Sequence, residues 1–267
     1  MNLGIEIFME DNDILVCRKL AGIPVQTAKP GQQDMVSLLK NYRAGRKEAP
    51  EVYVVHRLDQ PVEGLMVFAK NQKAAASLSK QIQQKSVDKY YYALVEGIPE
   101  PAEGRLEDWL LRDGRTNTSR VVPEGTKDAK KAVLFYKVLR AKTAESEQVQ
   151  TEKVLSGEAR DRETQMKEIQ SEGVRNGNVQ ENGIRSLAEI RLETGRHHQI
   201  RVQMAHAGCP LVGDKKYNPS CPGGYLPIGL CSVRLSFTHP TTGKRMEFSI
   251  EPLGEAFLKF RQGENAL

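Results

Sequence analysis

Short apolar runs that alternate with polar residues dominate the chain. Such runs, bounded by Gly, Pro, Asn and Asp, predict β-strands. We expect strands at Ile14–Arg18, Val52–Val55, Leu65–Ala69, Tyr90–Glu96, Arg105–Leu111, Ala132–Leu139, Leu187–Leu192, Cys231–Thr238 and Glu247–Ile250. The first residues, Met1–Ile7, also alternate in the manner of a strand.

Helical periodicity is visible in three segments. These are Gln72–Gln84, His197–Ala207 and Glu255–Arg261. Strands therefore outnumber helices, and the two do not alternate in regular β-α-β order. This arrangement predicts an α+β fold with a mainly antiparallel mixed sheet flanked by helices and loops.

The segment 141–186 departs from this pattern. It contains no aromatic residue and is rich in Glu, Gln, Ser, Arg, Asn and Gly. It cannot bury enough apolar surface to offset the entropy lost on ordering. We therefore expect a mobile surface insertion between two strands, which loop-closure entropy permits at small cost. Residues 1–267 are then predicted to form a single domain that carries this insertion.

The composition indicates the cellular location of the protein more than its chemistry. No apolar run approaches the roughly 18–20 residues of a membrane span, and the N-terminus lacks the features of a signal peptide. The four cysteines form no C-x-x-C pair, so we expect a reduced, cytoplasmic protein without a disulfide framework. The net charge of +5 suits an RNA partner but is equally typical of an ordinary, slightly basic protein.

The first run that carries chemistry is His-Arg-Leu-Asp at 56–59. It follows the strand predicted at Val52–Val55 and precedes the turn formers Pro61 and Gly64. Asp59 is therefore predicted on a loop anchored at both ends, which is a common place for catalytic groups. Taken alone, such a loop is more often a solvated hairpin turn.

The second run lies around the helix predicted from His197. Thr194 can cap that helix, and Gly195 permits a close approach of strand to helix. Arg196, His198 and Arg201 then add charge near a helix start, where anions are already favoured. An amphipathic helix with a solvated face is the simpler interpretation of the same residues.

No metal or cofactor is expected. The histidines at 197, 198 and 206 are not joined by a cysteine or carboxylate in a recognisable ligand pattern. Neither a dinucleotide-binding nor a P-loop motif is present.

The third run is Lys-Tyr-Tyr-Tyr-Ala-Leu-Val at 89–95. Strand alternation places Tyr90 and Tyr92 on one face and Tyr91 on the other. Three tyrosines in a strand usually pack in a core, but one beside a basic loop can stack on a base.

Together the three runs resemble the RluA-type pseudouridine synthases. The matching positions are His56–Asp59, Gly64, Ala69-Lys70, Lys89, Tyr91, Ala93–Val95, Gly97, Thr194–Arg196 and His198–Val202, with Gly208, Pro210, Gly213-Asp214 and Tyr217 in register. The resemblance covers nearly the whole chain outside the insertion. It implies the pseudouridine-synthase fold and an enzyme that isomerises uridine to pseudouridine in structured rRNA or tRNA.

The resemblance also implies roles for individual residues. Three positions are expected to be catalytic: Asp59 corresponds to the nucleophile, Arg201 to its ion-pair partner, and Tyr91 to the residue that packs on the target base and can help to remove the C5 proton. Five further positions are expected to bind RNA: Arg57, His56, Arg196, His198 and Gln199. The reaction breaks the N1–C1′ bond, turns the uracil and joins C5 to C1′. A carboxylate suits this step because it can attack or stabilise a cationic sugar carbon.

Departures from the family pattern leave the choice of RNA open. Val62-Glu63 replaces the usual Thr-Ser and brings a negative charge near the loop, while His197 and Gln203 replace a common Thr and His. The chain begins at the predicted catalytic domain, without the N-terminal RNA-binding module of some relatives. We expect a monomer that acts on RNA and not on DNA or membranes.

Two alternatives to an active synthase remain. The first is a catalytically silent RNA-binding protein with the same fold. The second is a small-molecule hydrolase that uses Asp59 with His56 or His198, although no third orienting group is evident.

Overall fold

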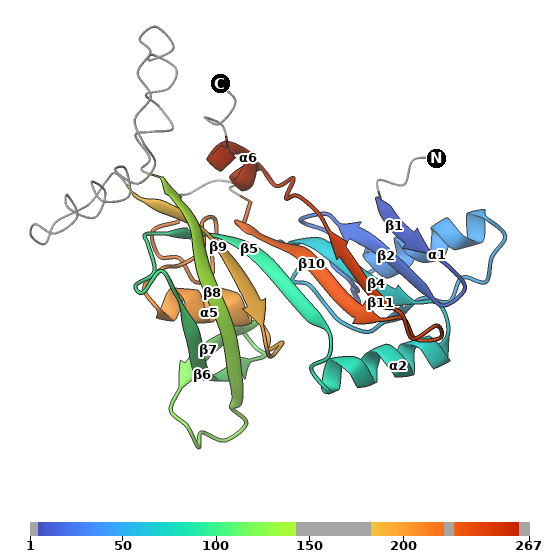
Figure 1. Cartoon of the computed structure of the whole chain (residues 1–267), viewed down its shortest axis with the longest axis horizontal. Helices are drawn as coiled ribbons and strands as arrows, with labels where there is room; N and C mark the ends of the chain where they lie inside the picture. The colour runs from blue at the N-terminus through green and yellow to red at the C-terminus, as the bar shows by residue number, and fades with distance from the viewer. Residues whose placement is uncertain (1–4, 143–182, 222–226, 262–267) are drawn as a thin grey trace, which may run out of the picture.

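The computed structural model describes residues 5–142, 183–221 and 227–261, and the strands within those ranges join a single eleven-stranded sheet (Figure 1). The order across the sheet is β1-β2-β4-β10-β5-β9-β8-β6-β7, with β3 paired to β4 and β11 to β10. The strands are β1 (Ile7–Glu10), β2 (Ile14–Lys19), β3 (Tyr53–Val54), β4 (Glu63–Ala69), β5 (Asp88–Glu96), β6 (Glu103–Asp113), β7 (Thr118–Val122), β8 (Lys130–Lys142), β9 (Arg185–Leu192), β10 (Leu230–Thr238) and β11 (Arg245–Ser249). The pair β4–β10 is parallel and the other pairs are antiparallel.

Four helices in the described ranges cover this sheet. They are α1 (Met35–Gly45), α2 (Gln72–Gln83), α5 (Gln199–His206) and α6 (Glu255–Arg261). Side chains of α1 and α5 pack into one core cluster, and side chains of α2 and α6 pack into a second. The predicted α+β class with a mixed, mainly antiparallel sheet is confirmed. None of these helices has the length and apolarity that crossing a membrane demands.

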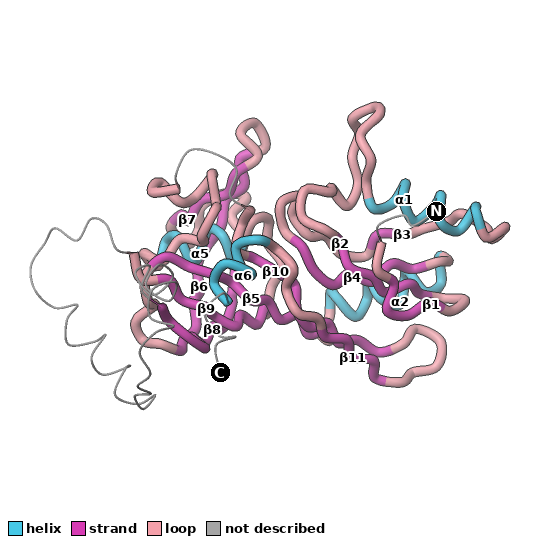
Figure 2. Tube along the Cα trace, turned by 90° about the horizontal axis from the view of Figure 1, so that it is seen from above, coloured by secondary structure: helices cyan, strands magenta, loops and turns pink. Residues whose placement is uncertain are grey.

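The central strands are buried on both faces of the sheet. In β2, Ile14 and Val16 enter the cluster that holds α2 and α6, whereas Leu15 and Cys17 enter the cluster that holds α1 and α5. A strand covered on both faces reads as a continuous apolar run and not as an alternating one. Figure 2 shows β5 and β10 between the two ends of the sheet, so these central strands link β1–β4 with β6–β9.

All nine strands predicted within the chain are present, but α1 and β7 were not predicted, and β1 covers Ile7–Glu10 where the alternation predicted a strand at Met1–Ile7. The signal for α1 existed, because Met35, Leu38, Leu39 and Tyr42 recur at helical spacing. Asp34 and Ser37 also form a reciprocal capping box at its start. The short strand β7 gives little apolar signal, since of its five residues only Ser119 is buried.

The helix predicted from His197 begins two residues later. His198 precedes its first turn in a left-handed conformation, with φ 54° and ψ 26°, and makes no side-chain cap. The predicted cap by Thr194 is wrong, because its hydroxyl donates to the Gln199 side chain at 2.7 Å. The bonds of Gln199 therefore fix the loop before α5.

Most of the predicted insertion lies outside the described residues, as do Met1–Gly4 of the N-terminal strand prediction. Its two flanks are described. Strands β8 and β9 are antiparallel neighbours, and Lys142 at the end of β8 pairs with Arg185 at the start of β9. The chain thus leaves and re-enters the sheet at one place, which is the condition under which an insertion perturbs a sheet least.

Candidate active site

Asp59 lies on the loop 55–62 between β3 and β4. Leu58 and Val62 are buried in the α1–α5 core cluster on either side of it. Between them the chain turns, and the Val62 amide donates to the Asp59 carbonyl at 3.0 Å. Two apolar anchors around a polar turn therefore hold the Asp59 carboxylate, which is 27% exposed, at the surface of the core.

A buried lysine donates hydrogen bonds to the same loop. Lys19, at the end of β2, is fully buried. Its Nζ donates to the carbonyls of Leu20 and Gln60 at 3.0 Å each and of Val62 at 2.6 Å. Burial lowers the pKa of Lys19 to about 7, against the opposing charges of Asp59 and Glu63. Its three donated bonds help to satisfy these carbonyls, of which that of Gln60 also accepts from the Gly22 amide at 2.9 Å.

Gly64 forms the junction between this loop and the centre of the sheet. It pairs in parallel with Ser232 of β10. A Cβ on Gly64 would lie 2.4 Å from the Ser232 backbone nitrogen, and its φ is 133°. Glycine is therefore required here to bring β4 against β10. Ser232 in turn pairs with Tyr91 of β5, so the sheet register brings Tyr91 towards the Asp59 loop.

Tyr91 is buried on the face of the sheet that carries Asp59. Tyr90 and Tyr92 pack against the opposite cluster, as the alternation predicted. Burial raises the pKa of the Tyr91 phenol, and the Asp59 charge raises it further. The phenol therefore stays protonated at neutral pH and can donate a hydrogen bond.

Arg201, in the first turn of α5, connects two carboxylates. Its Nε and Nη2 donate to the two oxygens of buried Asp214 at 2.8 and 2.7 Å. Its Nη1 donates to Asp59 Oδ2 at 3.2 Å. Burial lowers the pKa of Arg201, but the bonds and charge of Asp214, together with Asp59, raise it overall. The fork is thus fixed on Asp214 and presents one donor to Asp59.

His198 approaches the same carboxylate from the loop before α5. Its Nε2 lies 3.6 Å from Asp59 Oδ2, and its Nδ1 bonds the Tyr217 hydroxyl at 2.7 Å. Burial lowers the pKa of His198 to about 4, with Arg201 acting in the same direction and Asp59 opposing it. His198 is therefore neutral at physiological pH and adds no charge beside Asp59.

The other residues predicted to contact RNA are placed differently from one another. Arg57 is exposed on the Asp59 loop. His56 points at β4, where its Nε2 accepts from the Val67 amide at 3.1 Å. Arg196 is exposed and donates to the Lys131 carbonyl at 2.8 Å.

Gln199 is buried, and its amide is occupied within the protein. The Oε1 accepts from Thr194 and the Arg196 amide, and the Nε2 donates to Val133 and Gln203. These bonds fit a residue that positions the loop. Contact of these residues with RNA remains a prediction.

Glu63 does not face the solvent around Asp59. Both Val62 and Glu63 are buried, and the Glu63 oxygens accept from the amides of Leu253 and Gly254 at 3.3 and 2.7 Å. The expectation that this pair bears on RNA choice therefore has no basis in direct contact. Glu63 instead holds the chain just before α6.

In the described part of the chain, three side chains of the kinds that bind metals lie close together: Asp11, Asp13 and His239. His239 Nδ1 accepts from the amides of Thr241 and Thr242 at 3.2 and 3.0 Å. Its Nε2 must then carry the proton, which it donates to Asp11 at 2.7 Å. Both ring nitrogens of His239 are therefore occupied, and these hydrogen bonds hold two turns together.

Several contributors to the site carried no assigned role in the sequence. Asp214 and Tyr217 stood in register after the second motif, so their positions were visible while their partners were not. Lys19, Ser119 and Ser232 gave no local signal. Their contacts arise from strand pairing and from approaches between segments that are distant in sequence.

The chain is similar to known proteins over most of its length. A family model described as RNA pseudouridylate synthase matches residues 13–206. The uncharacterized RNA pseudouridine synthase YlyB of Bacillus subtilis is 31% identical over 258 residues, covering 95% of this chain and 70% of that protein. The ribosomal large subunit pseudouridine synthase D of Neisseria meningitidis is also 31% identical, and the match covers 92% of this chain but 58% of that protein.

Solved structures show the same fold. The human RNA pseudouridylate synthase domain containing 4 superposes with a TM-score of 0.68 at 18% identity, covering 96% of this chain and 91% of that one. The human domain-containing 1 protein gives a TM-score of 0.65 at 20% identity. At these identities the similarity establishes the architecture alone.

Proposed function

The chain belongs to the RNA pseudouridylate synthase family, and we propose that it isomerises uridine in ribosomal RNA with Asp59 as the nucleophile. The observation that carries this proposal is the pairing of Asp59 with Arg201. A partly exposed carboxylate receives one donor from an arginine whose other two donors are fixed on a buried aspartate. These bonds orient the Asp59 carboxylate while leaving it accessible.

The proposed isomerisation requires an anion such as this carboxylate. As the N1–C1′ bond breaks, positive charge develops on the sugar carbon, and an anion can attack or stabilise it. The uracil then turns, C5 bonds to C1′, the C5 proton leaves and N1 gains a proton. Arg201 would orient the Asp59 carboxylate through its hydrogen bond, and neutral His198 adds no competing charge.

Tyr91 is assigned to packing on the target base. Its raised pKa keeps the phenol protonated at neutral pH, which favours packing and hydrogen-bond donation over removal of the C5 proton. A base in structured RNA must first be extruded from its stack, at a cost of a few kcal/mol. Exposed Arg57, two residues before Asp59, is suited to hold the distorted backbone.

Ribosomal RNA is proposed as the substrate because of the relatives. The Neisseria meningitidis protein is named as a synthase of the large ribosomal subunit. The chain spans 58% of that protein, so its substrate is carried over as a proposal. Transfer RNA and a silent RNA-binding role are the outcomes against which it is tested.

The test uses ribosomal and transfer RNA from cells that lack the gene. Each pool is incubated with wild-type or Asp59→Ala protein, and pseudouridine is mapped by carbodiimide labelling and reverse-transcription stops. We expect a new stop in ribosomal RNA with the wild type alone. A stop only in transfer RNA would overturn the substrate, and RNA binding by both proteins without any stop would overturn the activity.

A further inference from the structure

The hairpin β6–β7 carries an arginine on the side of the molecule that faces the Asp59 site. In this hairpin Arg112 pairs directly with Ser119, while Leu111 pairs with Arg120. Directly paired residues of antiparallel strands project to the same face, and neighbours along a strand project to opposite faces. Arg112 therefore shares the face of Ser119, and Arg120 lies on the other.

Ser119 shows where that face points. Its hydroxyl bonds His197 Nδ1 at 2.9 Å, and its amide donates to the Tyr217 hydroxyl at 2.8 Å. Tyr217 is the partner of His198, and the rings of His197 and His198 stack with centroids 3.8 Å apart. Through these contacts the face that carries Arg112 is fixed to the loop beside Asp59.

The tip of the hairpin is held by two further bonds. His197 Nε2 bonds the Asn117 side chain at 3.1 Å, and Lys216 Nζ donates to the Asn117 carbonyl at 2.6 Å. Lys216 therefore lies at the same corner as His197. The charges of Arg112 and Lys216 both act to lower the pKa of His197, as expected for cations within electrostatic reach of its ring.

These two cations have no carboxylate partner among the described residues. Both are exposed. Asp59 and Asp214 are both bonded to Arg201, and Asp113, next to Arg112, accepts from the amides of Arg115 and Thr116. These two cations therefore keep positive charge at this corner, where the hairpin carries Arg112 and Lys216 lies at its tip.

We propose that Arg112 and Lys216 form a phosphate-binding subsite for the RNA backbone that flanks the target uridine, and that His197 positions the hairpin that carries it. The proposal rests on the RNA-modifying function proposed above. A guanidinium and an ammonium at one corner suit a phosphodiester, which accepts charge-assisted hydrogen bonds from both. Such contacts set where the RNA lies relative to Asp59 without reading its sequence.

The test compares Arg112→Ala with Arg120→Ala, which removes the same side chain from the opposite face of the same hairpin. Initial rates on the RNA identified above are measured across a salt series, and RNA affinity is measured separately by fluorescence anisotropy. Arg112→Ala is expected to raise the KM about five- to tenfold, leave kcat within twofold and lower the salt slope by about one phosphate contact. Arg120→Ala should change KM less than twofold, and Arg112→Lys should recover most of the loss.

His197→Ala separates position from charge. It removes no cation, so the KM should rise while the salt slope stays that of the wild type. Equal effects of the Arg112 and Arg120 variants, or a fall in kcat alone, would overturn the subsite. A wild-type protein that binds RNA but makes no pseudouridine would refute the proposed function, while the anisotropy data would still decide on the subsite.

Discussion

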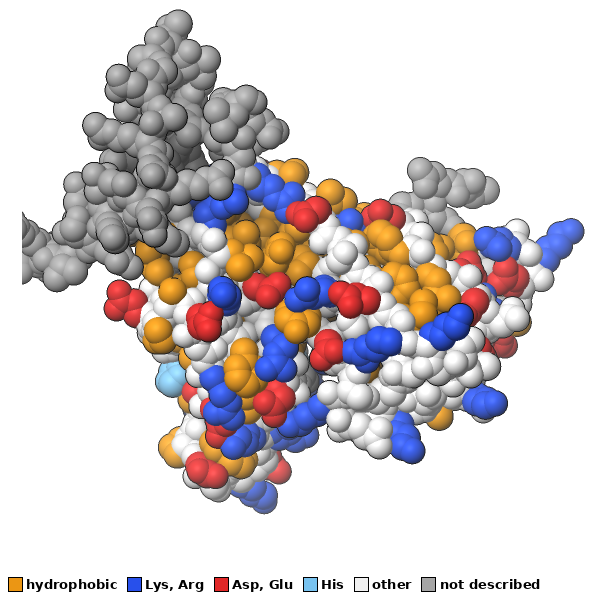
Figure 3. All heavy atoms as spheres, viewed as in Figure 1, with side chains coloured by type: hydrophobic (Ala, Val, Ile, Leu, Met, Phe, Trp, Pro, Cys, Tyr) orange, Lys and Arg blue, Asp and Glu red, His pale blue; other side chains and the backbone are white. Residues whose placement is uncertain are grey.

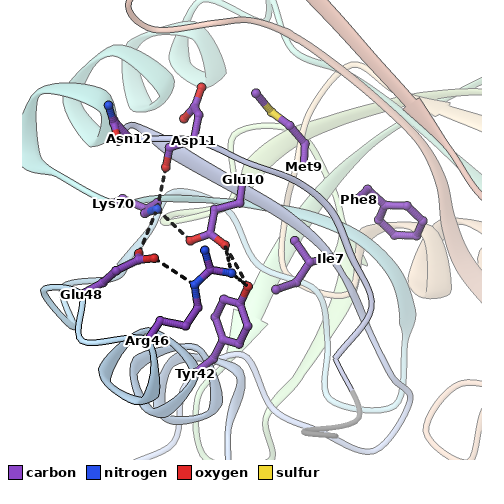
Figure 4. A pocket seen from close by; sticks show the side chains of 10 residues that line it. All are labelled: Ile7, Phe8, Met9, Glu10, Asp11, Asn12, Tyr42, Arg46, Glu48 and Lys70. Atoms are coloured by element: carbon purple, nitrogen blue, oxygen red, sulfur yellow. Dashed lines mark hydrogen bonds and ion pairs between the residues drawn. The ribbon is translucent and has the colours of Figure 1, made fainter.

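Two polar clusters of this molecule contain similar side chains and differ in how their charges are used. The groove cluster comprises Glu10, Tyr42, Arg46, Glu48 and Lys70, and it lines an open groove beside β1 and α1 (Figure 4). The site cluster comprises Asp59, His198, Arg201 and Asp214. The groove cluster lines a hollow of the surface, yet the site cluster is the one that we propose for catalysis.

In the groove cluster the charges neutralise one another. Lys70 Nζ lies 2.7 Å from Glu10 and 3.4 Å from Glu48, and Arg46 Nε lies 2.9 Å from Glu48. The Tyr42 hydroxyl bonds both Glu10 and Arg46. Two cations therefore serve two carboxylates, and the network has little capacity left for a ligand.

In the site cluster the Asp59 carboxylate can accept further hydrogen bonds. Arg201 is shared between two carboxylates, and within the described residues the Asp59 side chain accepts a hydrogen bond from Arg201 alone. A carboxylate offers about four acceptor positions. The comparison teaches that an accessible, incompletely satisfied group held by a rigid frame marks the site better than the shape of a hollow does. On the face shown in Figure 3, basic and acidic side chains are interleaved, so the distribution of surface charge alone does not identify a site there.

The largest effect is expected when the shared arginine is removed. Arg201→Met leaves Asp214 buried without its partner and Asp59 without its donor, so turnover should fall at least about a hundredfold. Removing one partner of a buried pair also destabilises a protein by about 3–5 kcal/mol. Rates and denaturant unfolding would be measured together.

Arg46→Met in the groove cluster is the control for this variant. It breaks an exposed ion pair, and its effect on stability should stay within about 1 kcal/mol with turnover unchanged. Near-normal turnover by the Arg201 variant would contradict the contrast between the clusters.

Replacing Lys19 and Lys70 in turn tests the difference between the Asp59 loop and the groove cluster. Lys19→Met removes the hydrogen bonds that Nζ donates to the Gln60 and Val62 carbonyls of the Asp59 loop, and we expect turnover per folded molecule to fall about tenfold. Lys70→Met removes a largely buried cation from the groove cluster and should lower stability while turnover per folded molecule stays within twofold. Thermal unfolding and rates on the same samples would check this, and equal losses of turnover would show that the effect is general destabilisation.

Tyr91 is expected to affect the chemical step more than binding. With its pKa raised by burial, the phenol does not ionise near neutral pH. Tyr91→Phe should leave RNA affinity within about threefold, and kcat of the wild type should show no rise between pH 7 and 9 that the variant lacks. A rise of kcat with pH that disappears in the variant would assign Tyr91 to proton removal instead.

The smallest effect concerns stability in mild acid. Burial, with the charge of Lys89, lowers the pKa of His56 to about 3. The unfolded chain binds this proton below about pH 6.5 and the folded chain does not, so stability falls as pH decreases from 6.5 towards 3, by about 1 kcal/mol per pH unit. His56→Asn should flatten this slope in urea titrations at pH 5 and 7. An unchanged slope would mean that His56 does not stay neutral in the fold.

Much of the fold could be predicted because its central strands are buried on both faces and carry long apolar runs. The motifs also located Asp59, Tyr91 and Arg201 on separate elements that the structure brings to one place. The strand β7 escaped prediction because it is short and mostly polar. The cap assigned to Thr194 was wrong because its hydroxyl is taken by Gln199.

What the sequence could not supply were contacts between distant segments. Lys19 reaches the carbonyls of Gln60 and Val62, and Ser119 reaches His197 and Tyr217, only once the sheet is formed. The burial of Glu63 likewise depends on the chain before α6. Local patterns predict elements and reactive groups, whereas the partners that tune those groups depend on tertiary structure.

The central claim, that Asp59 performs the isomerisation, is tested most directly by the hydrogen that the reaction must release. Each uridine converted loses its C5 hydrogen, so RNA labelled with tritium at C5 reports one release per pseudouridine. We predict single-turnover release by the wild type and at least about a thousandfold slower release by Asp59→Asn, with unfolding temperature and RNA affinity preserved. Release by the Asp59→Asn protein within tenfold of the wild type would contradict the account.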